Sequence, residues 1–225
     1  MGEAKLRKMA RAAGVGDQAS SAAVRGPWWH GTDAQFHEWV IPPPRKADST
    51  PLDMPHKFLF FTQERDYALG AGSRLCQVQL RPEAKVLTPG EASTGSRKLR
   101  QSLLTHPNAR LCASLRSEEA WRVSWTDGTA LRFSAEQQVV QKFIAKVAMG
   151  YAAKYPGLAP EEYALAASQS ITRGWIELIS DHALSLGYDA IQGRELDSKS
   201  GPGASRSWMA VLRAEAITPP DWAAA

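Results

Sequence analysis

The most restrictive feature of the sequence is the run Trp28-Trp29-His30-Gly31-Thr32, at which aromatic residues begin abruptly. Two adjacent tryptophans followed closely by a glycine predict a short buried strand that ends in a turn. The strand places the His30 imidazole at its end, and Gly31 has no Cβ, which lets a ligand approach the backbone closely. An isolated triplet of this kind is more often a core histidine in a tight turn, so its meaning depends on the segments that follow.

Size and composition fit an ordinary folded domain. The chain has 225 residues, of which 44% are hydrophobic and 22% charged, enough for one domain with insertions or two small ones. No apolar run approaches the roughly 18 residues that span a bilayer, and residues 1–24 lack the apolar centre of a secretory signal peptide. We therefore expect a cytoplasmic protein, or one delivered into a host cell, with no membrane partner.

The net charge and the cysteine content exclude few classes of function. The formal net charge is +4, and part of it is concentrated in the basic residues of the first dozen positions, Lys5, Arg7, Lys8 and Arg11. A solvated basic leader explains this better than a site for a polyanion. Only Cys76 and Cys112 are present, with no Cys-x-x-Cys pair and no Cys/His cluster, so we expect no metal site.

Hydrophobic patterning predicts strands and helices along most of the chain. Strands are expected at Trp28–Thr32, Phe58–Thr62, Leu75–Leu80, Ala84–Leu87, Tyr188–Ile191 and Ser207–Leu212. Helices are expected at Ala34–Val40, Glu64–Ala71 with Thr62 as N-cap, Lys98–Leu104, Ala135–Tyr151, Glu161–Ile171 and Trp175–Leu186. Asp127-Gly128 predicts a hairpin between Trp121–Trp125 and Thr129–Phe133. Residues 41–55, rich in proline, and 192–205, rich in glycine and serine, predict loops.

The order of these elements indicates an α+β fold. Strands flank a central helical stretch, and several strands that are neighbours in sequence require antiparallel pairing, unlike a doubly wound parallel sheet. No Gly-x-Gly-x-x-Gly motif follows a strand, so nothing in the sequence supports a Rossmann cofactor site. We expect a flexible basic leader at 1–24, a domain at 25–219 with an insertion at about 91–165, and a tail at 220–225.

Four segments, taken in order, resemble the ADP-ribosyltransferases of the branch that contains diphtheria toxin and the poly(ADP-ribose) polymerases. They are Trp28–Thr32; Phe60-Phe61-Thr62 with Tyr67-Ala68; the strand-turn-strand run 75–87; and Leu186-Gly187-Tyr188-Asp189-Ala190-Ile191. The resemblance implies a split antiparallel or mixed β-sheet core with a mostly helical insertion. It also implies that NAD is the substrate, that nicotinamide is released, and that ADP-ribose passes to a macromolecule.

The resemblance also assigns residues to the NAD site. It implies that His30 bonds the nicotinamide-side ribose, that the Gly31 backbone binds the carboxamide, and that Thr32 shapes the turn. Phe61 and Thr62 would line the site on the second strand.

The aromatic residue expected to face the nicotinamide ring fits the family pattern less well. Tyr67 would face the ring together with Phe61, although the tyrosine of the family falls nearer Gly70 or Ala71 by spacing. Two interpretations stay open: Tyr67 substitutes from one turn earlier, or it only packs against its neighbours.

The catalytic acid is the main departure from the family. Cleavage of the nicotinamide bond passes through an oxocarbenium-like ion that a carboxylate stabilises. The family places a glutamate at the start of the last strand, and that position falls here on Ser207 or Trp208. Glu195, on the Gly-rich loop before that strand, is the provisional acid, and a solvated loop charge is the alternative.

Three functions follow from these observations. The first is an NAD-dependent ADP-ribosyltransferase that modifies a protein or nucleic acid, such as a bacterial or phage toxin or effector, a role compatible with a neutralising partner. The second is an inactive module that binds NAD or ADP-ribose, because the acid position holds Ser207 or Trp208. The third is an enzyme like the RNA 2′-phosphotransferases, which needs basic residues at the pocket such as Arg25, Arg194 and Arg206.

Overall fold

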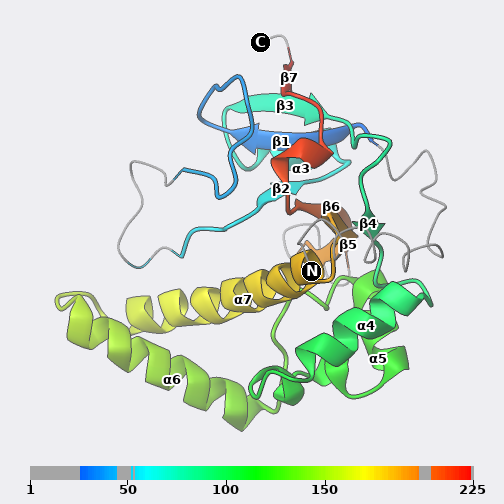
Figure 1. Ribbon diagram of the computed structural model, residues 1–225. Helices are drawn as coiled ribbons and strands as arrows, with labels where there is room; N and C mark the ends of the chain where they lie inside the picture. The colour runs from blue at the N-terminus through cyan, green and yellow to red at the C-terminus, as the bar shows by residue number, and fades with distance from the viewer. Residues whose placement is uncertain (1–25, 45–51, 53, 198–203, 224–225) are drawn as a thin grey trace, which may run out of the picture.

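The computed structural model describes residues 26–44, 52, 54–197 and 204–223. Within these residues the strands form two small sheets toward one end of the molecule, and the longer helices lie toward the other end (Figure 1). Antiparallel and parallel strand pairs both occur. The expectation of an α+β fold with mixed pairing is therefore confirmed.

Each sheet joins strands from the two ends of the described chain. Sheet A has the order β1 (Trp28–Thr32), β3 (Arg74–Val78), β7 (Asp221–Trp222). Sheet B has the order β2 (Leu59–Phe61), β6 (Ser205–Val211), β5 (Ala190–Leu196), β4 (Val86–Leu87), with a parallel pair only between β4 and β5 among these strands. Strand β7 lies in the segment that we expected to be a tail, and its pairing with β3 makes it part of the fold.

The two sheets meet at a backbone bridge between Trp29 of β1 and Thr62, which directly follows β2. The Trp29 N–H donates to the Thr62 carbonyl over 2.7 Å, and the Thr62 N–H donates to the Trp29 carbonyl over 3.0 Å. We call this bridge and the residues beside it the sheet junction. Beyond the bridge each sheet follows its own strand order.

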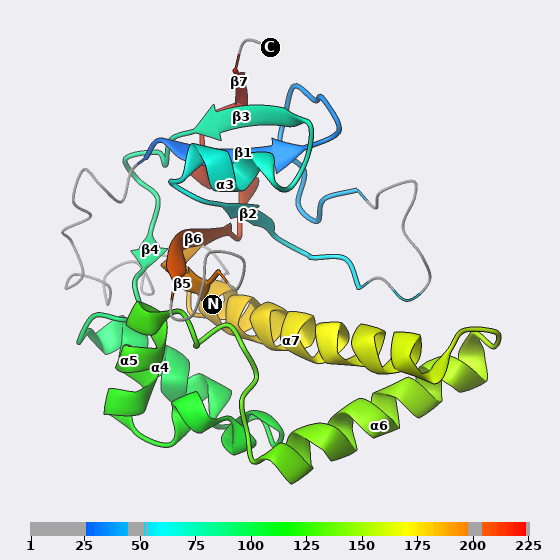
Figure 2. The same cartoon turned by 180° about the vertical axis from the view of Figure 1, so that it is seen from behind.

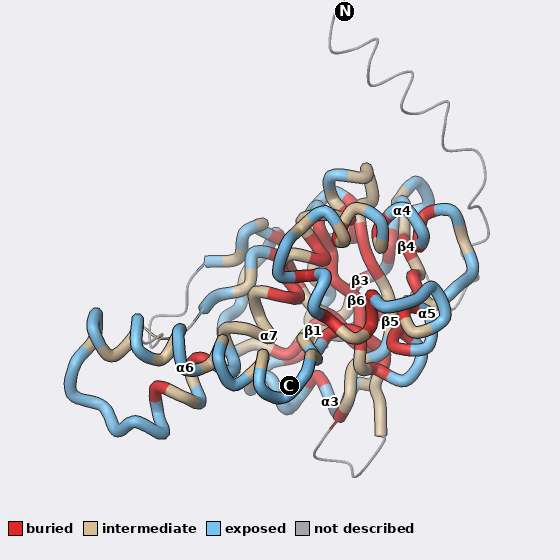
Figure 3. The backbone as a smooth tube through the Cα atoms, turned by 90° about the horizontal axis from the view of Figure 1, so that it is seen from below, coloured by how far each residue is buried: buried red, intermediate tan, exposed pale blue. Residues whose placement is uncertain are grey.

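Most of the helices lie on the side of sheet B and extend away from it, whereas a short one lies beside sheet A (Figure 2). Their bounds are α3 (Arg65–Leu69), α4 (Thr94–Leu103), α5 (Glu118–Asp127), α6 (Gln137–Lys154) and α7 (Pro160–Ser185). Short 3₁₀ turns occupy Ala109–Leu111, Ala113–Leu115 and Ala214–Ala216. Helix α3 packs on β1, whereas α6 packs along α7 and buries none of its residues fully. Figure 3 shows the buried residues concentrated around the sheets and the covering helices.

The buried side chains of the described residues form two clusters, one on each face of sheet B. On β6, Trp208 and Ala210 pack with the helices, whereas Met209 and Val211 pack with sheet A. Successive side chains of a strand point to opposite faces, so this alternation fixes which face each residue occupies. Ser207 therefore shares the face of Met209 and points toward sheet A.

The expected hairpin at Asp127-Gly128 is wrong. Residues 118–127 form α5, which begins after the Ser117 N-cap and ends at Gly128, whose φ is +88°. A glycine in the left-handed region is as typical of a helix end as of a tight hairpin. The helix is favoured over the hairpin because Trp121 and Trp125, four positions apart, are both buried on one helical face.

Other element expectations need smaller corrections. Residues 34–40 form bends rather than a helix, because the Trp39 indole donates to the Thr218 carbonyl and Phe36 packs on Trp222. Thr62 is not the N-cap of α3: that position is Glu64, and the Thr62 backbone makes the sheet junction. The helices expected at 161–171 and 175–186 are one continuous helix, α7.

A buried carboxylate on α7 ties down the segment that leads into β2. Glu177 is 3% exposed, and its carboxylate lies 2.8 Å from His56 Nδ1 and accepts a hydrogen bond from the Lys57 N–H at 3.2 Å. The pKa of His56 lies below its ordinary value, chiefly because burial disfavours the charged ring and despite the hydrogen bond to Glu177.

This histidine predicts a loss of stability in mild acid. In the unfolded chain His56 takes up a proton near its ordinary pKa of 6.5, which the folded protein resists. Its contribution to the free energy of unfolding is therefore present above that pH and is lost as the pH falls. Urea titrations of the protein and of His56→Gln should show their difference shrinking from about pH 7.5 to about pH 5.5. A difference that grows toward acid would contradict the prediction.

Candidate functional site

His30 lies at the sheet junction on the face of β1 that points toward sheet B. Its Nδ1 lies 2.8 Å from the Phe60 carbonyl oxygen of β2. Its ring lies 5.4 Å from the rings of both Trp39 and Phe61, measured between centroids. Because a carbonyl only accepts, the neutral ring carries its proton on Nδ1, which leaves Nε2 as an acceptor. The imidazole is thus fixed in both orientation and tautomer.

Gly31 presents its backbone at the same place. The N–H and C=O groups of Trp29 point to Thr62, and residues two apart in a strand point the same way, so those of Gly31 point to that edge of β1. The ladder does not continue there, because the Phe60 carbonyl interacts with His30 instead. The space that Gly31 leaves by having no Cβ is already filled: a Cβ would lie 1.8 Å from the Ala68 carbonyl oxygen of α3. Gly31 is itself a buried residue whose face is closed by α3, and its polar backbone groups lie along the strand edge.

Three other residues that the sequence assigned to NAD lie at or beside the junction. Phe61 and Thr62 are buried, at 3% and 6% exposed. The Phe61 ring packs against the His30 ring from the buried side. Thr32 ends β1, and its hydroxyl accepts a hydrogen bond from the Ala34 N–H at 3.3 Å, which fits the turn-shaping role expected for it.

Tyr67 lies on α3 in a neighbouring cluster of charged residues. The Arg206 guanidinium lies 5.9 Å above its ring, and the side chain is 36% exposed. Burial raises the pKa of the Tyr67 hydroxyl, and the nearby carboxylates of Glu195 and Asp197 raise it further. The hydroxyl therefore stays protonated at neutral pH and is available as a donor.

Glu195 lies on strand β5 rather than on a loop, opposite Arg206 of β6. On β5, Gly193 faces Trp125 of α5, so Glu195, two residues later, points to the helical side of sheet B. Burial raises the pKa of its carboxyl group. The provisional acid is thus on the opposite face of the sheet from Ser207.

The sequence analysis missed Glu64, whose carboxylate lies at the position where an acid was expected. Its Oε2 accepts hydrogen bonds from the Thr62 hydroxyl at 2.7 Å and the Ser207 hydroxyl at 3.2 Å. Its Oε1 lies 3.3 Å from the Ser207 backbone nitrogen, which donates to it. The Ser207 hydroxyl also accepts from the Gln63 N–H at 2.7 Å. The sequence signal was Thr-x-Glu directly after an aromatic strand, where a side chain can fold back onto the strand end.

Two groups of residues therefore stand close to β1 and α3. The sheet junction brings together His30, the Gly31 edge, Thr62, Glu64 and Ser207, whereas Tyr67, Glu195, Asp197 and Arg206 form the second group. Trp208, the other position expected for the acid, is buried against the helices. Among the described residues no group of three or more His, Cys, Asp or Glu side chains is arranged to hold a metal ion.

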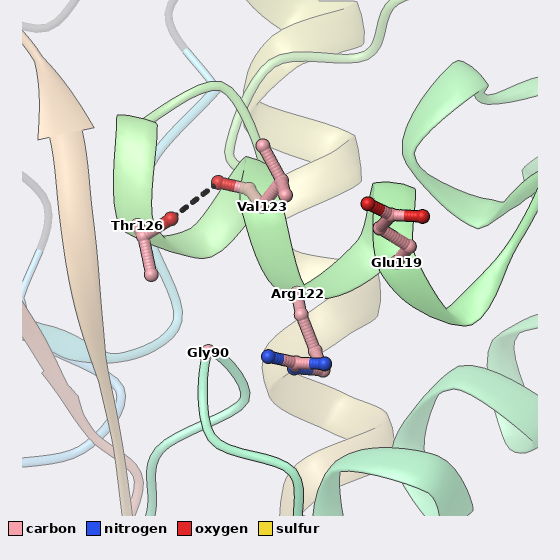
Figure 4. A pocket seen from close by; sticks show the side chains of 5 residues that line it. All are labelled: Gly90, Glu119, Arg122, Val123 and Thr126. Atoms are coloured by element: carbon pink, nitrogen blue, oxygen red, sulfur yellow. Dashed lines mark hydrogen bonds between the residues drawn. The ribbon is translucent and has the colours of Figure 1, made fainter.

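A surface pocket lies elsewhere, between α5 and the turn before α4. It is lined by Gly90, Glu119, Arg122, Val123 and Thr126 (Figure 4). The Thr126 hydroxyl donates to the Val123 carbonyl at 2.8 Å within the helix. The pocket contains no residue that the sequence analysis singled out.

Comparison with known proteins leaves the family open. No family model matches the chain, and no curated protein matches its sequence. One solved structure, described as the crystal structure of an anti-CRISPR protein, aligns over 88% of this chain and 95% of its own, with 15% identity and a TM-score of 0.39. A likeness of this size does not establish a shared fold. Within the described residues, no helix combines the length and apolar character that crossing a bilayer needs.

Proposed function

We propose that this protein is an NAD-dependent ADP-ribosyltransferase that modifies a macromolecule, protein or nucleic acid, and releases nicotinamide. The observation that supports the proposal most is the composition of the sheet junction. It combines an oriented histidine, the backbone edge of Gly31, at which the strand ladder stops, and a carboxylate that accepts hydrogen bonds from Thr62 and Ser207. His30 and Gly31 come from the first of the sequence segments that resemble the transferases, and Glu64 lies between the two parts of the second.

The reaction breaks one bond of NAD and forms another. The bond between ribose C1′ and the nicotinamide nitrogen breaks, and its electron pair stays on the nicotinamide, which leaves as a neutral molecule. C1′ then bonds to an oxygen or nitrogen of the acceptor, whose proton is released to solvent. The positive charge that develops on the ribose is what the protein has to stabilise.

The residues at the junction have distinct roles in this proposal. The Gly31 N–H and C=O pair with the carboxamide of nicotinamide, which offers one acceptor and two donors. His30 Nε2 accepts a hydrogen bond from a ribose hydroxyl. Tyr67, exposed at the rim on α3, contacts the nicotinamide ring, and Phe61 supports His30 from beneath.

A second candidate is a module that binds NAD or ADP-ribose without turnover. It is motivated by Ser207, which cannot itself supply a charge at the start of β6. Calorimetry with NAD, combined with a nicotinamide assay, separates the two functions, because the module binds without releasing nicotinamide. The phosphotransferase alternative has less support, since Arg194 bonds the Ser205 hydroxyl and carbonyl and Arg206 is paired with Asp197.

Replacing His30 tests the proposal. His30→Ala should slow nicotinamide release from NAD by roughly 100-fold or more, because the ribose loses a positioned partner. The control is His37→Ala, an exposed histidine seven residues away, which should leave the rate unchanged. His30→Ala also leaves the Phe60 carbonyl without its imidazole, so both variants need melting curves. Wild-type protein that gives neither labelled acceptor in a cell lysate nor free nicotinamide would refute the proposal.

A further inference from the structure

We propose that Glu64 is the carboxylate that stabilises the ribosyl cation at the sheet junction. The inference rests on the proposed function, because it names the residue that makes the transfer feasible. It departs from the sequence analysis, which expected an acid on or before the last strand. The acid comes instead from the turn between β2 and α3.

The reaction itself requires such a group. As the bond from C1′ to nicotinamide breaks, positive charge spreads over C1′ and the ring oxygen of the ribose, as in glycoside hydrolysis. A carboxylate fixed near this charge lowers the barrier because it needs no rearrangement as the charge appears. A suitable side chain is therefore ionised, held in place and close to the nucleotide-binding residues.

Two other acids near Tyr67 meet these conditions less well than Glu64. Asp197 is 5% exposed, and its carboxylate already forms an ion pair with Arg206 at 3.0 Å. Glu195 points to the helical side of sheet B, away from the face that Ser207 shares with Met209.

Glu64 is held by donors from both strands that border it. The hydroxyl groups of Thr62 on the β2 side and Ser207 on β6 donate to one oxygen, and the Ser207 N–H donates to the other. Hydrogen bonds from several donors fix the orientation of the carboxylate. Glu64 is half-buried, so its carboxylate combines this fixed position with access from the surface.

Thr62 links the turn that carries Glu64 to the strand that carries His30. Thr62 bonds Glu64 through its hydroxyl and bridges to Trp29 through its backbone, and Trp29 directly precedes His30. One residue therefore positions the carboxylate and anchors the strand that carries the histidine. This gives Ser207 and Thr62 a positioning role in place of a catalytic one.

The test compares Glu64→Gln with Glu195→Gln and Asp66→Asn in the full chain. Glutamine keeps the shape and an oxygen that accepts from both hydroxyls, but its NH2 cannot accept from the Ser207 N–H, so the melting temperature is measured beside the rate to separate lost structure from lost charge. We expect the rate constant of nicotinamide release to fall by roughly 100- to 1,000-fold in Glu64→Gln, while the NAD dissociation constant changes less than about threefold. Asp66, exposed on the first turn of α3, is the matched control and should behave as wild type.

Each outcome decides one question. If the wild type neither binds NAD nor releases nicotinamide, the proposed function is wrong and the role of Glu64 falls with it. If the wild type is active and Glu64→Gln keeps its rate, only the role of Glu64 is overturned. A loss confined to Glu195→Gln would reassign the acid to β5. Melting temperatures within about 2 °C of wild type show that the variants are folded.

Discussion

Gly31→Ala is expected to lower the free energy of unfolding by about 3 kcal/mol or more. The added Cβ would lie 1.8 Å from the Ala68 carbonyl oxygen and 2.7 Å from its carbonyl carbon. Both atoms belong to the backbone of α3, so no side-chain rotation relieves the clash. Either the helix separates from β1 or the strand bends, and both movements disturb the sheet junction.

Gly150→Ala is the matched control for this substitution. Gly150 lies within α6, and no heavy atom outside its own helix lies within 4 Å of the Cβ that alanine would add. Alanine is the better helix former, so this variant should gain roughly 0.5–1 kcal/mol. Urea unfolding followed by circular dichroism measures both changes. A loss below about 1 kcal/mol in Gly31→Ala would show that α3 is not packed as tightly as the structure has it.

Trp125→Ala is expected to cost about 3–5 kcal/mol, the usual range for emptying a large buried aromatic site. Trp125 is 1% exposed and packs on Trp121 and Trp208, with ring centroids 5.4 and 6.3 Å away. Gly193 of β5 makes room for it, because a Cβ there would lie 2.5 Å from the indole. The cavity would therefore open between α5 and sheet B.

Two comparisons make this prediction specific. Val123 lies on the same helix but is 50% exposed, so Val123→Ala should change stability by less than about 0.5 kcal/mol. The buried Nε1 of Trp125 has no hydrogen-bond partner among the described residues. Trp125→Phe removes that unsatisfied donor and should therefore cost much less than alanine. Equal losses in the phenylalanine and alanine variants would argue against this explanation.

The sequence predicted the strands and the helix around the junction because short runs of residues are enough to determine them. The aromatic runs at residues 28–29 and 58–61 form strands wherever they are buried, and β1, β2 and α3 lie where they were expected. Asp127-Gly128 misled because a left-handed glycine serves a hairpin and a helix end equally well. The burial of Trp121 and Trp125 against sheet B decided between them, and that contact is not visible in a short window of sequence.

Glu64 was missed for a related reason. Its hydrogen bonds to Ser207 join residues 143 positions apart, and no local sequence pattern at either residue predicts this contact. Glu195 attracted attention because it lies close in sequence to the expected position, yet the alternation of β5 turns it to the other face. Proximity along the chain was a poor guide where the sheet brings its first and last strands together.

The strand order also determines when the sheets become able to form. Residues 59–61 pair with 209–211, and residues 76–77 pair with 221–222, so each sheet needs partners from opposite ends of the chain. During synthesis, helices α4 to α7 leave the ribosome long before β6 and β7 do. We expect them to associate first, while β2 has not yet met its partner β6 in sheet B. Closing such long loops is slow, and it leaves an aromatic strand exposed until translation is nearly complete.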